Sequence, residues 1–179
     1  AKYAIQITNI GSGYSRLTDD FLYNAWNFEG QEVFKRAVKA MAQASEDVLK
    51  QAGMSLDDIK LVVPHQANKR ILNALAKRIG IDEDKVFVNV HKYGNTSAGT
   101  IPVALAEALE EKRIEPGDHI LMASFGAGLT YGASLIKWGE RVVPLKSSDA
   151  KLPPCENTAL ELIAAHIERY KTRELSSTS

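Results

Sequence analysis

Apolar residues in the first half of the chain alternate between helical and extended spacing. From residue 31 to residue 52 they recur at steps of three and four positions, which predicts a helix with one buried face. Residues 59–63 form a short β-rich run, so a strand is expected to lead through a proline to His65. A second helical pattern spans residues 68–79, and a glycine follows each helix as its stop signal.

The same alternation continues in the second half. Residues 86–90 have the pattern of another buried strand, and residues 91–99 form a loop rich in Gly, Asn, Ser and Thr. A third helix is expected over residues 101–112, because its proline falls in the first turn, where proline is tolerated. Residues 119–124 and 130–138 suit two strands joined by a glycine-rich hairpin. This order of helices and strands predicts an α/β layer.

The two ends of the chain carry weaker patterns. The first part, residues 1–29, contains one expected strand at residues 3–8 and is otherwise polar and aromatic. At the other end, a linker with two prolines leads to a last amphipathic helix near residues 159–170. The sequence therefore predicts an N-terminal segment, a domain of residues 30–138 and a C-terminal extension of residues 139–179.

Charge and hydropathy argue against several classes of protein. The 22 Lys and Arg residues balance 22 Asp and Glu residues, so no net field directs the chain to nucleic acid or to an anionic membrane. No apolar run approaches the roughly 18 residues of a membrane span, and the first ten residues do not resemble a signal peptide. The single cysteine, Cys155, allows no internal disulfide, so a cytoplasmic protein is expected.

Signatures of nucleotide and metal binding are missing from the sequence. No glycine fingerprint for a dinucleotide or a phosphate follows an expected strand. The four histidines, His65, His91, His119 and His166, lack the spacing of zinc ligands, which argues against a metal hydrolase. No bound metal is therefore expected.

Three segments could carry chemistry and one group of basic residues could bind a partner, and each has a purely structural alternative. His65 follows a buried strand, where an imidazole can serve a site or simply pack. Asn95 lies in a glycine-flanked loop, which suits either a functional amide or a turn before a helix. Residues 125–128 could direct backbone N–H groups at a reacting oxygen or form a tight hairpin. Three basic residues of the second helix either receive an acidic partner or are only solvated: Arg70, Lys77 and Arg78.

Taken together, three motifs follow one another in a specific order and spacing. They are Pro64-His65-Gln66-Ala67-Asn68, Gly94-Asn95-Thr96-Ser97-Ala98 and Phe125-Gly126-Ala127-Gly128-Leu129-Thr130-Tyr131-Gly132. With Gly30-Gln31-Glu32-Val33-Phe34-Lys35 at the start of the first helix, residues 29–138 resemble the β-ketoacyl-acyl carrier protein synthases III. The resemblance implies the C-terminal half of a thiolase-like, five-layered αβαβα fold, with a mixed five-stranded sheet and helices.

The resemblance also implies an activity. Such enzymes are acyltransferases that begin fatty acid biosynthesis by a decarboxylating Claisen condensation of an acyl-CoA with malonyl-acyl carrier protein. It implies that His65 and Asn95 donate hydrogen bonds to the malonyl thioester oxygen and stabilise the enolate. The backbone N–H of Ala127 matches a position of the oxyanion hole for the acylated cysteine.

Further positions match binding residues of the family. Those near the substrate and coenzyme A are Gly30, Phe34, Asn68 and Phe125. Those that match or neighbour basic positions for the acidic carrier protein are Lys35, Arg70, Lys77 and Arg78. No cofactor is implied, because coenzyme A and carrier-protein thioesters enter as substrates.

The nucleophilic cysteine of the family belongs to the other half. Cys155 lies in a tail outside the resemblance and is a poor candidate. The chain is thus expected to be a fragment, to pair with a separate cysteine-bearing chain, or to be a noncatalytic half that binds carrier protein or acts as a scaffold. A related condensing enzyme of secondary metabolism is a further alternative. The full enzyme is expected to be a homodimer, and this chain alone is expected to be inactive.

Overall fold

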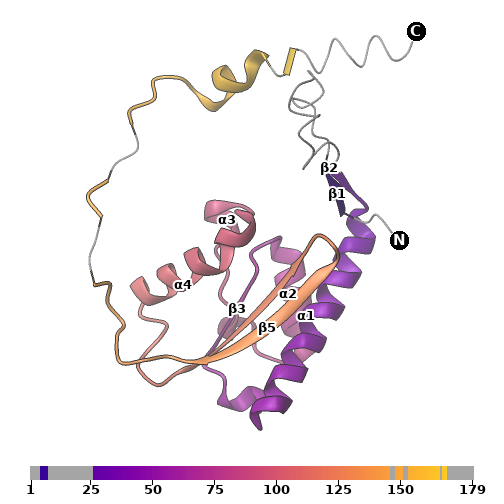
Figure 1. The fold of residues 1–179 in the computed structure, drawn as a ribbon, viewed down its shortest axis with the longest axis vertical. Helices are drawn as coiled ribbons and strands as arrows, with labels where there is room; N and C mark the ends of the chain where they lie inside the picture. Colours follow the sequence, from indigo (N-terminus) through magenta and orange to yellow (C-terminus); the bar gives the residue numbers. More distant parts are fainter. Residues whose placement is uncertain (1–4, 8–25, 146–147, 151–152, 166, 169–179) are drawn as a thin grey trace. The chain divides into compact units, whose positions relative to one another are not determined.

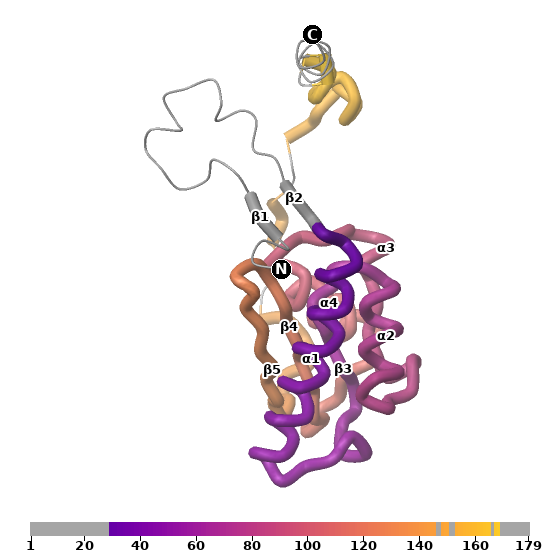
Figure 2. The backbone as a smooth tube through the Cα atoms, turned by 90° about the vertical axis from the view of Figure 1, so that its right-hand side faces the viewer, coloured from indigo at the N-terminus to yellow at the C-terminus, as the bar shows by residue number. Residues whose placement is uncertain are grey.

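The computed structural model describes residues 5–7, 26–145, 148–150, 153–165 and 167–168. The chain divides into two compact units, Ala1–Val143 and Pro144–Ser179. Figure 1 shows the helices and strands of the first unit, and β4 is labelled in Figure 2. No helix in the described ranges is long and apolar enough to cross a membrane.

Two helices, α1 (Gly30–Ala52) and α2 (Lys69–Ile79), confirm the first two helical predictions. α1 ends at Gly53, whose φ of 65° lies in the left-handed region that glycine adopts without strain. α2 begins at an N-cap, because the side chain of Asn68 accepts a hydrogen bond from the N–H of Arg70. Both helix ends therefore follow from local sequence signals.

The main sheet consists of β3 (Leu61–Pro64), β4 (His119–Gly126) and β5 (Thr130–Lys137), in that order. β3 runs parallel to β4, and β4 runs antiparallel to β5. β4 is therefore the central strand of a mixed sheet. Figure 2 shows α1 and α2 lying together over one face of this sheet.

Helices cover both faces of the sheet, in three layers. Val62 and Leu121 pack with residues of α1 and α2, whereas Leu61 and Ile120 pack against Ala104 of α4 (Thr100–Glu110). All four residues of β3 are buried, as expected for a strand covered on both faces. Figure 1 shows α3 (Val90–Tyr93) and α4 on the side of the sheet opposite α1 and α2. The predicted α/β class and mixed sheet are confirmed.

The predicted count of five strands in one sheet is wrong for the described part of the chain. The first expected strand appears as β1 (Ile5–Ile7), which pairs with β2 (Trp26–Phe28) in a separate two-stranded sheet. The expected strand at residues 86–90 makes a single parallel bridge, between Val86 and Val62. The strand ends after this bridge, because the side chain of Gln66, and not a neighbouring strand, bonds to the carbonyl of Phe87 and the N–H of Asn89.

The segment predicted as a loop at residues 91–99 contains two short helices. α3 occupies its start and the 3₁₀ turn η4 (Ser97–Gly99) its end, directly before α4. Pro102 lies in the first turn of α4, as predicted, since a proline there breaks no intrahelical hydrogen bond. The glycine-rich hairpin between β4 and β5 is also confirmed.

The second unit contains a short helical segment. Residues 159–165 and 167–168 are helical, and the rest of the predicted stretch of residues 159–170 lies outside the described residues. A capping box begins this helix, because Thr158 and Glu161 exchange hydrogen bonds between side chain and backbone. The division into segments 1–29, 30–138 and 139–179 stays a prediction.

Candidate active site

His65 is held at the carboxyl end of β3 by two contacts. Its N–H donates to the carbonyl of Ala123 on β4 at 2.8 Å, which extends the parallel ladder one residue beyond Pro64. Its ring nitrogen Nδ1 lies 2.6 Å from Oγ1 of Thr100, the first residue of α4. The ring is half-buried, and this burial lowers the pKa of His65 below the ordinary value of 6.5. The neutral form of the imidazole therefore predominates at pH 7.

Asn95 lies in the exposed loop between α3 and η4. Its Oδ1 accepts a hydrogen bond from the N–H of Ser97 at 2.9 Å, which fixes the orientation of the amide. Within the described residues its Nδ2 group makes no hydrogen bond, so both amide hydrogens are available to a ligand. The turn predicted for this motif is present, and the same turn leaves the side chain as a donor.

No hydrogen bond among the described residues joins His65 directly to Asn95. They are connected through Thr100, which bonds to His65 and follows η4 at the end of the Asn95 loop. The structure thus ties the two motifs to one helix start, although they lie 30 positions apart in the sequence.

A buried polar network fixes the segment that leads to Asn95. The side chain of Gln66 donates to the carbonyls of Pro64 and Phe87 at 2.8 and 3.0 Å and accepts from the N–H of Asn89 at 2.9 Å. The amide of Asn89 in turn donates to Glu107 of α4 at 2.8 Å. Gln66 and Asn89 are only 1% and 2% exposed, so these bonds have no solvent substitute.

Lys92 of α3 joins this network through Glu107. Its ammonium group bonds to Glu107 and lies 3.4 Å from the carboxylate of Glu111. The hydrogen bond from Lys92 lowers the pKa of Glu107, although burial acts in the opposite direction. The short helix α3, which alone has too few turns to be stable, is thereby anchored to α4.

Replacement of Gln66 by leucine should destabilise the fold strongly. Three buried backbone groups lose their partner, and each such group costs free energy when it stays unpaired. We expect the free energy of unfolding, measured by urea denaturation, to fall by about 3 kcal/mol.

The matched control is Gln43→Leu on α1, where an exposed side chain bonds to Asp47. That variant should change the free energy of unfolding by less than about 0.5 kcal/mol. Equal effects of the two substitutions would contradict the role given to the Gln66 network.

The β4–β5 hairpin lies at the same end of the sheet as His65. β3 and β4 are parallel with Pro64 opposite Ala123, and the turn at residues 127–129 follows a few residues later. Gly128 has a φ of 132°, and a Cβ there would come within 2.9 Å of Thr130. Only glycine fits position 128 of this turn. Ala127 is exposed at the same end of the sheet.

The predicted substrate-binding residues fall into two environments. Phe34 of α1 and Arg70 of α2 are neighbours, with the guanidinium carbon 6.0 Å from the ring centroid. Asn68 is exposed at the N-cap of α2, three residues after His65. The side chain of Phe125, by contrast, is buried in the cluster between the sheet and α1. Gly30 begins α1, where a Cβ would meet nothing within 4 Å.

The basic residues also separate. Arg70 and the exposed Lys35 belong to the ends of α2 and α1 that lie next to Phe34. Lys77 and Arg78 are exposed in the last turn of α2, about 11 Å from Arg70 along the helix axis at 1.5 Å per residue. The structure therefore places Arg70, and not Lys77 or Arg78, beside the residues that follow His65.

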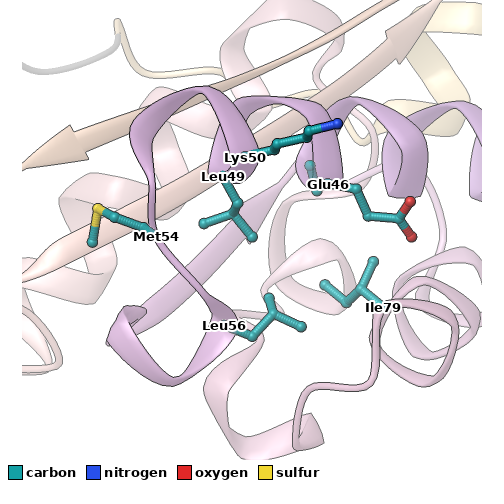
Figure 3. A pocket seen from close by; sticks show the side chains of 7 residues that line it. Glu46, Leu49, Lys50, Met54, Leu56 and Ile79 are labelled. Atoms are coloured by element: carbon teal, nitrogen blue, oxygen red, sulfur yellow. The ribbon is translucent and has the colours of Figure 1, made fainter.

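An apolar groove at the other end of β3 takes no part in this arrangement. It has a volume of about 390 Å³ and is shown in Figure 3. Its lining comes from the end of α1, the turn before β3 and the end of α2: Ser45, Glu46, Leu49, Lys50, Met54, Leu56 and Ile79. None of the residues predicted for the site lines it.

Sequence reasoning missed Thr100, Gln66, Asn89 and Glu107. One signal was present, because Glu107 is an acidic residue within the most apolar stretch of the third helix, where a charge needs a partner. Gln66 lies within the histidine motif, but nothing local shows that it reaches residues more than 20 positions away.

Comparison with known proteins gives consistent matches. The profile of the family described as 3-oxoacyl-[acyl-carrier-protein (ACP)] synthase III C terminal matches residues 49–138. The β-ketoacyl-[acyl-carrier-protein] synthase III 2 of Vibrio cholerae is 49% identical over 170 residues, which are 95% of this chain and 47% of that protein. The chain thus spans about half the length of this relative.

Solved structures of related enzymes share the fold of this chain. The 3-oxoacyl-[acyl-carrier-protein] synthase III of Aquifex aeolicus is 48% identical with a TM-score of 0.63, over 65% of this chain and 38% of that one. The priming β-ketosynthase of the R1128 polyketide biosynthetic pathway is 29% identical with a TM-score of 0.67, over 76% and 41%. The chain therefore belongs to the 3-oxoacyl-[acyl-carrier-protein] synthase III family and corresponds to its C-terminal, thiolase-like part.

Proposed function

We propose that this chain is the C-terminal catalytic half of a β-ketoacyl-acyl carrier protein synthase III, acting in the cytoplasm. The observation that carries the proposal is the position of His65, a neutral, half-buried imidazole at the carboxyl end of β3. Family membership supports the same reading of the site. A cysteine from the N-terminal half, in the same polypeptide or a partner chain, supplies the nucleophile.

The proposed reaction has two stages. First, the cysteine gives up its proton and its sulfur attacks the thioester carbon of an acyl-CoA, and coenzyme A leaves as its thiol by taking up that proton. Second, the bond between the malonyl carboxylate and its α-carbon breaks, carbon dioxide leaves, and the electron pair forms an enolate of the carrier-protein thioester. The α-carbon of the enolate then attacks the acyl-cysteine, which forms a β-ketoacyl thioester and releases the cysteine.

His65 and Asn95 act in the second stage. Negative charge collects on the malonyl thioester oxygen as carbon dioxide leaves, and donors already in place stabilise that charge most. The uncharged ring of His65 and the free Nδ2 group of Asn95 are suitable donors. The backbone N–H of Ala127, on the hairpin at the same sheet end, would serve the thioester oxygen of the acyl-cysteine. No metal or further cofactor is needed.

Binding of substrates is assigned to the neighbourhood of His65. We assign the pantetheine arm and the acyl group to a binding site formed by Gly30, Phe34, Asn68 and Phe125. Phe125 is buried, so it acts only by shaping the wall of this site. The acidic carrier protein is proposed to dock on Lys35 and Arg70, and more peripherally on Lys77 and Arg78. The complete enzyme is proposed to be a homodimer.

A chimeric enzyme tests the proposal directly. The matching part of the Vibrio cholerae synthase III 2 is replaced by this chain, so that the N-terminal half of that relative precedes it. We expect the chimera to form β-ketoacyl-acyl carrier protein from an acyl-CoA and malonyl-acyl carrier protein. A chimera that folds, takes up the acyl group and releases no carbon dioxide from malonyl-acyl carrier protein would favour the noncatalytic scaffold instead.

A role in polyketide priming is a second candidate. It is supported by the similarity to the priming β-ketosynthase of the R1128 pathway, which extends over 76% of this chain. A panel of acyl-CoA substrates and of carrier proteins in the same assay separates the two roles, since a fatty acid enzyme prefers the fatty acid carrier protein.

A further inference from the structure

The contact between His65 and Thr100 has a direction that determines what the imidazole can do. A neutral imidazole carries one hydrogen, on Nδ1 or on Nε2. If Nδ1 carries it, Nδ1 donates to Thr100 Oγ1 and Nε2 is left as an acceptor. If Nε2 carries it, the Thr100 hydroxyl donates to Nδ1 and Nε2 is a donor. Only the second arrangement can stabilise a developing oxyanion.

Burial of Thr100 distinguishes the two arrangements. Thr100 is 3% exposed, and its hydroxyl oxygen has His65 Nδ1, at 2.6 Å, as its one hydrogen-bond partner within the described residues. If Nδ1 were the donor, the hydroxyl hydrogen of Thr100 would be buried without an acceptor, which native structures avoid. If the hydroxyl is the donor, its hydrogen and the lone pair of Nδ1 satisfy one another.

We propose that Thr100 is a positioning residue whose hydroxyl donates to Nδ1 of His65 and thereby keeps the hydrogen of the neutral ring on Nε2. The catalytic consequence of this inference rests on the proposed function, whereas the position of the hydrogen does not. Thr100 is well suited to this task because it is the first residue of α4 and directly follows the loop of Asn95. Thr100 therefore links the orientation of the His65 ring to the position at which the Asn95 loop ends.

The tautomer can be measured on this 179-residue chain by ¹⁵N NMR of histidine-labelled protein, at a pH above the pKa of His65. The ring signals of His65 are assigned as those that disappear in His65→Gln. We expect two widely separated nitrogen resonances, with the hydrogen on Nε2. A hydrogen on Nδ1 in the unmodified chain would overturn the inference without any variant.

Two substitutions of Thr100 complete the test. Thr100→Ser keeps the hydroxyl and should keep the separated resonances, whereas Thr100→Val keeps the shape and should move both nitrogens toward intermediate values. If Thr100→Val does not fold, Thr100→Ala replaces it. An unchanged tautomer in the variant without the hydroxyl contradicts the inference.

The outcome is independent of the proposed function. If the chimera is inactive while the hydrogen of His65 lies on Nε2 and depends on Thr100, the proposed function fails and the inference stands. If the chimera is active and the tautomer does not respond to Thr100, the inference fails alone.

Discussion

Substitution of His65 by alanine in the chimera is expected to lower the rate of malonyl decarboxylation by about 10² to 10³. The ring, the proposed donor, contacts the hydroxyl of Thr100 through Nδ1, whereas the carbonyl of Ala123 accepts from the backbone N–H of His65. Alanine removes the ring and keeps the backbone contact. Loss of one preorganised donor removes stabilisation only where charge develops, so the effect should fall on the turnover number. The measurement is carbon dioxide release from malonyl-acyl carrier protein.

Two comparisons make this result specific. His91→Ala on α3 removes an exposed imidazole in the same fold and should leave the rate within about twofold, as is usual for surface substitutions. Transfer of the acyl group to the cysteine, measured by mass in the same His65→Ala protein, should persist, because no enolate forms in that stage. If acyl transfer and decarboxylation fall together, His65 serves the structure of the site and not the enolate.

The helices were predictable because their signals are local. The spacing of apolar residues in α1 and α2, the N-cap Asn68 and the stop at Gly53 all lie within or beside the helix they specify. The same holds for the position of His65 after β3, since a proline at the end of a short β-rich run is visible in the sequence.

The strand expected at residues 86–90 could not be predicted correctly from local sequence signals. Val86 and Phe87 are buried as expected, but burial does not determine hydrogen-bond partners. The N–H of Phe87 donates to the carbonyl of Val62 on β3, but the side chain of Gln66 then bonds to the carbonyl of Phe87 and the N–H of Asn89 in place of a neighbouring strand. A sequence pattern cannot distinguish these two ways of satisfying a backbone. β2, with only three residues, is too short to show any alternation.

The site itself was predictable only in part. The motifs locate His65 and Asn95, but not the hydrogen bond to Thr100, because its partners are 35 residues apart. The distinction between Arg70 beside Phe34 and the remote pair Lys77 and Arg78 likewise needs the packing of α2 on α1. Tertiary contacts therefore decide which matching residues lie together.

A large loss of stability is expected from a substitution in β4, the central strand of the sheet. Leu121→Ala is expected to lower the free energy of unfolding by about 3 to 4 kcal/mol, because the side chain is fully buried and leaves a cavity. It lies opposite Val62 of β3 and packs with Leu49 of α1, so two layers lose contacts at once. Urea denaturation of the 179-residue chain provides the measurement.

Leu135→Ala is the matched control, because Leu135 lies opposite Leu121 in the register of β4 and β5 but is only half-buried on the edge strand. We expect it to cost about 1 kcal/mol, since less apolar surface leaves the core. Equal losses for the two leucines would mean that β4 is not the strand on which the core depends.

The packing of β4 matters for the site, because β4 supplies the carbonyl of Ala123 that holds the backbone of His65 and continues into the hairpin of Ala127. A chain that keeps β4 firmly packed therefore keeps the histidine and the hairpin in fixed register, as the proposed stabilisation of an enolate requires.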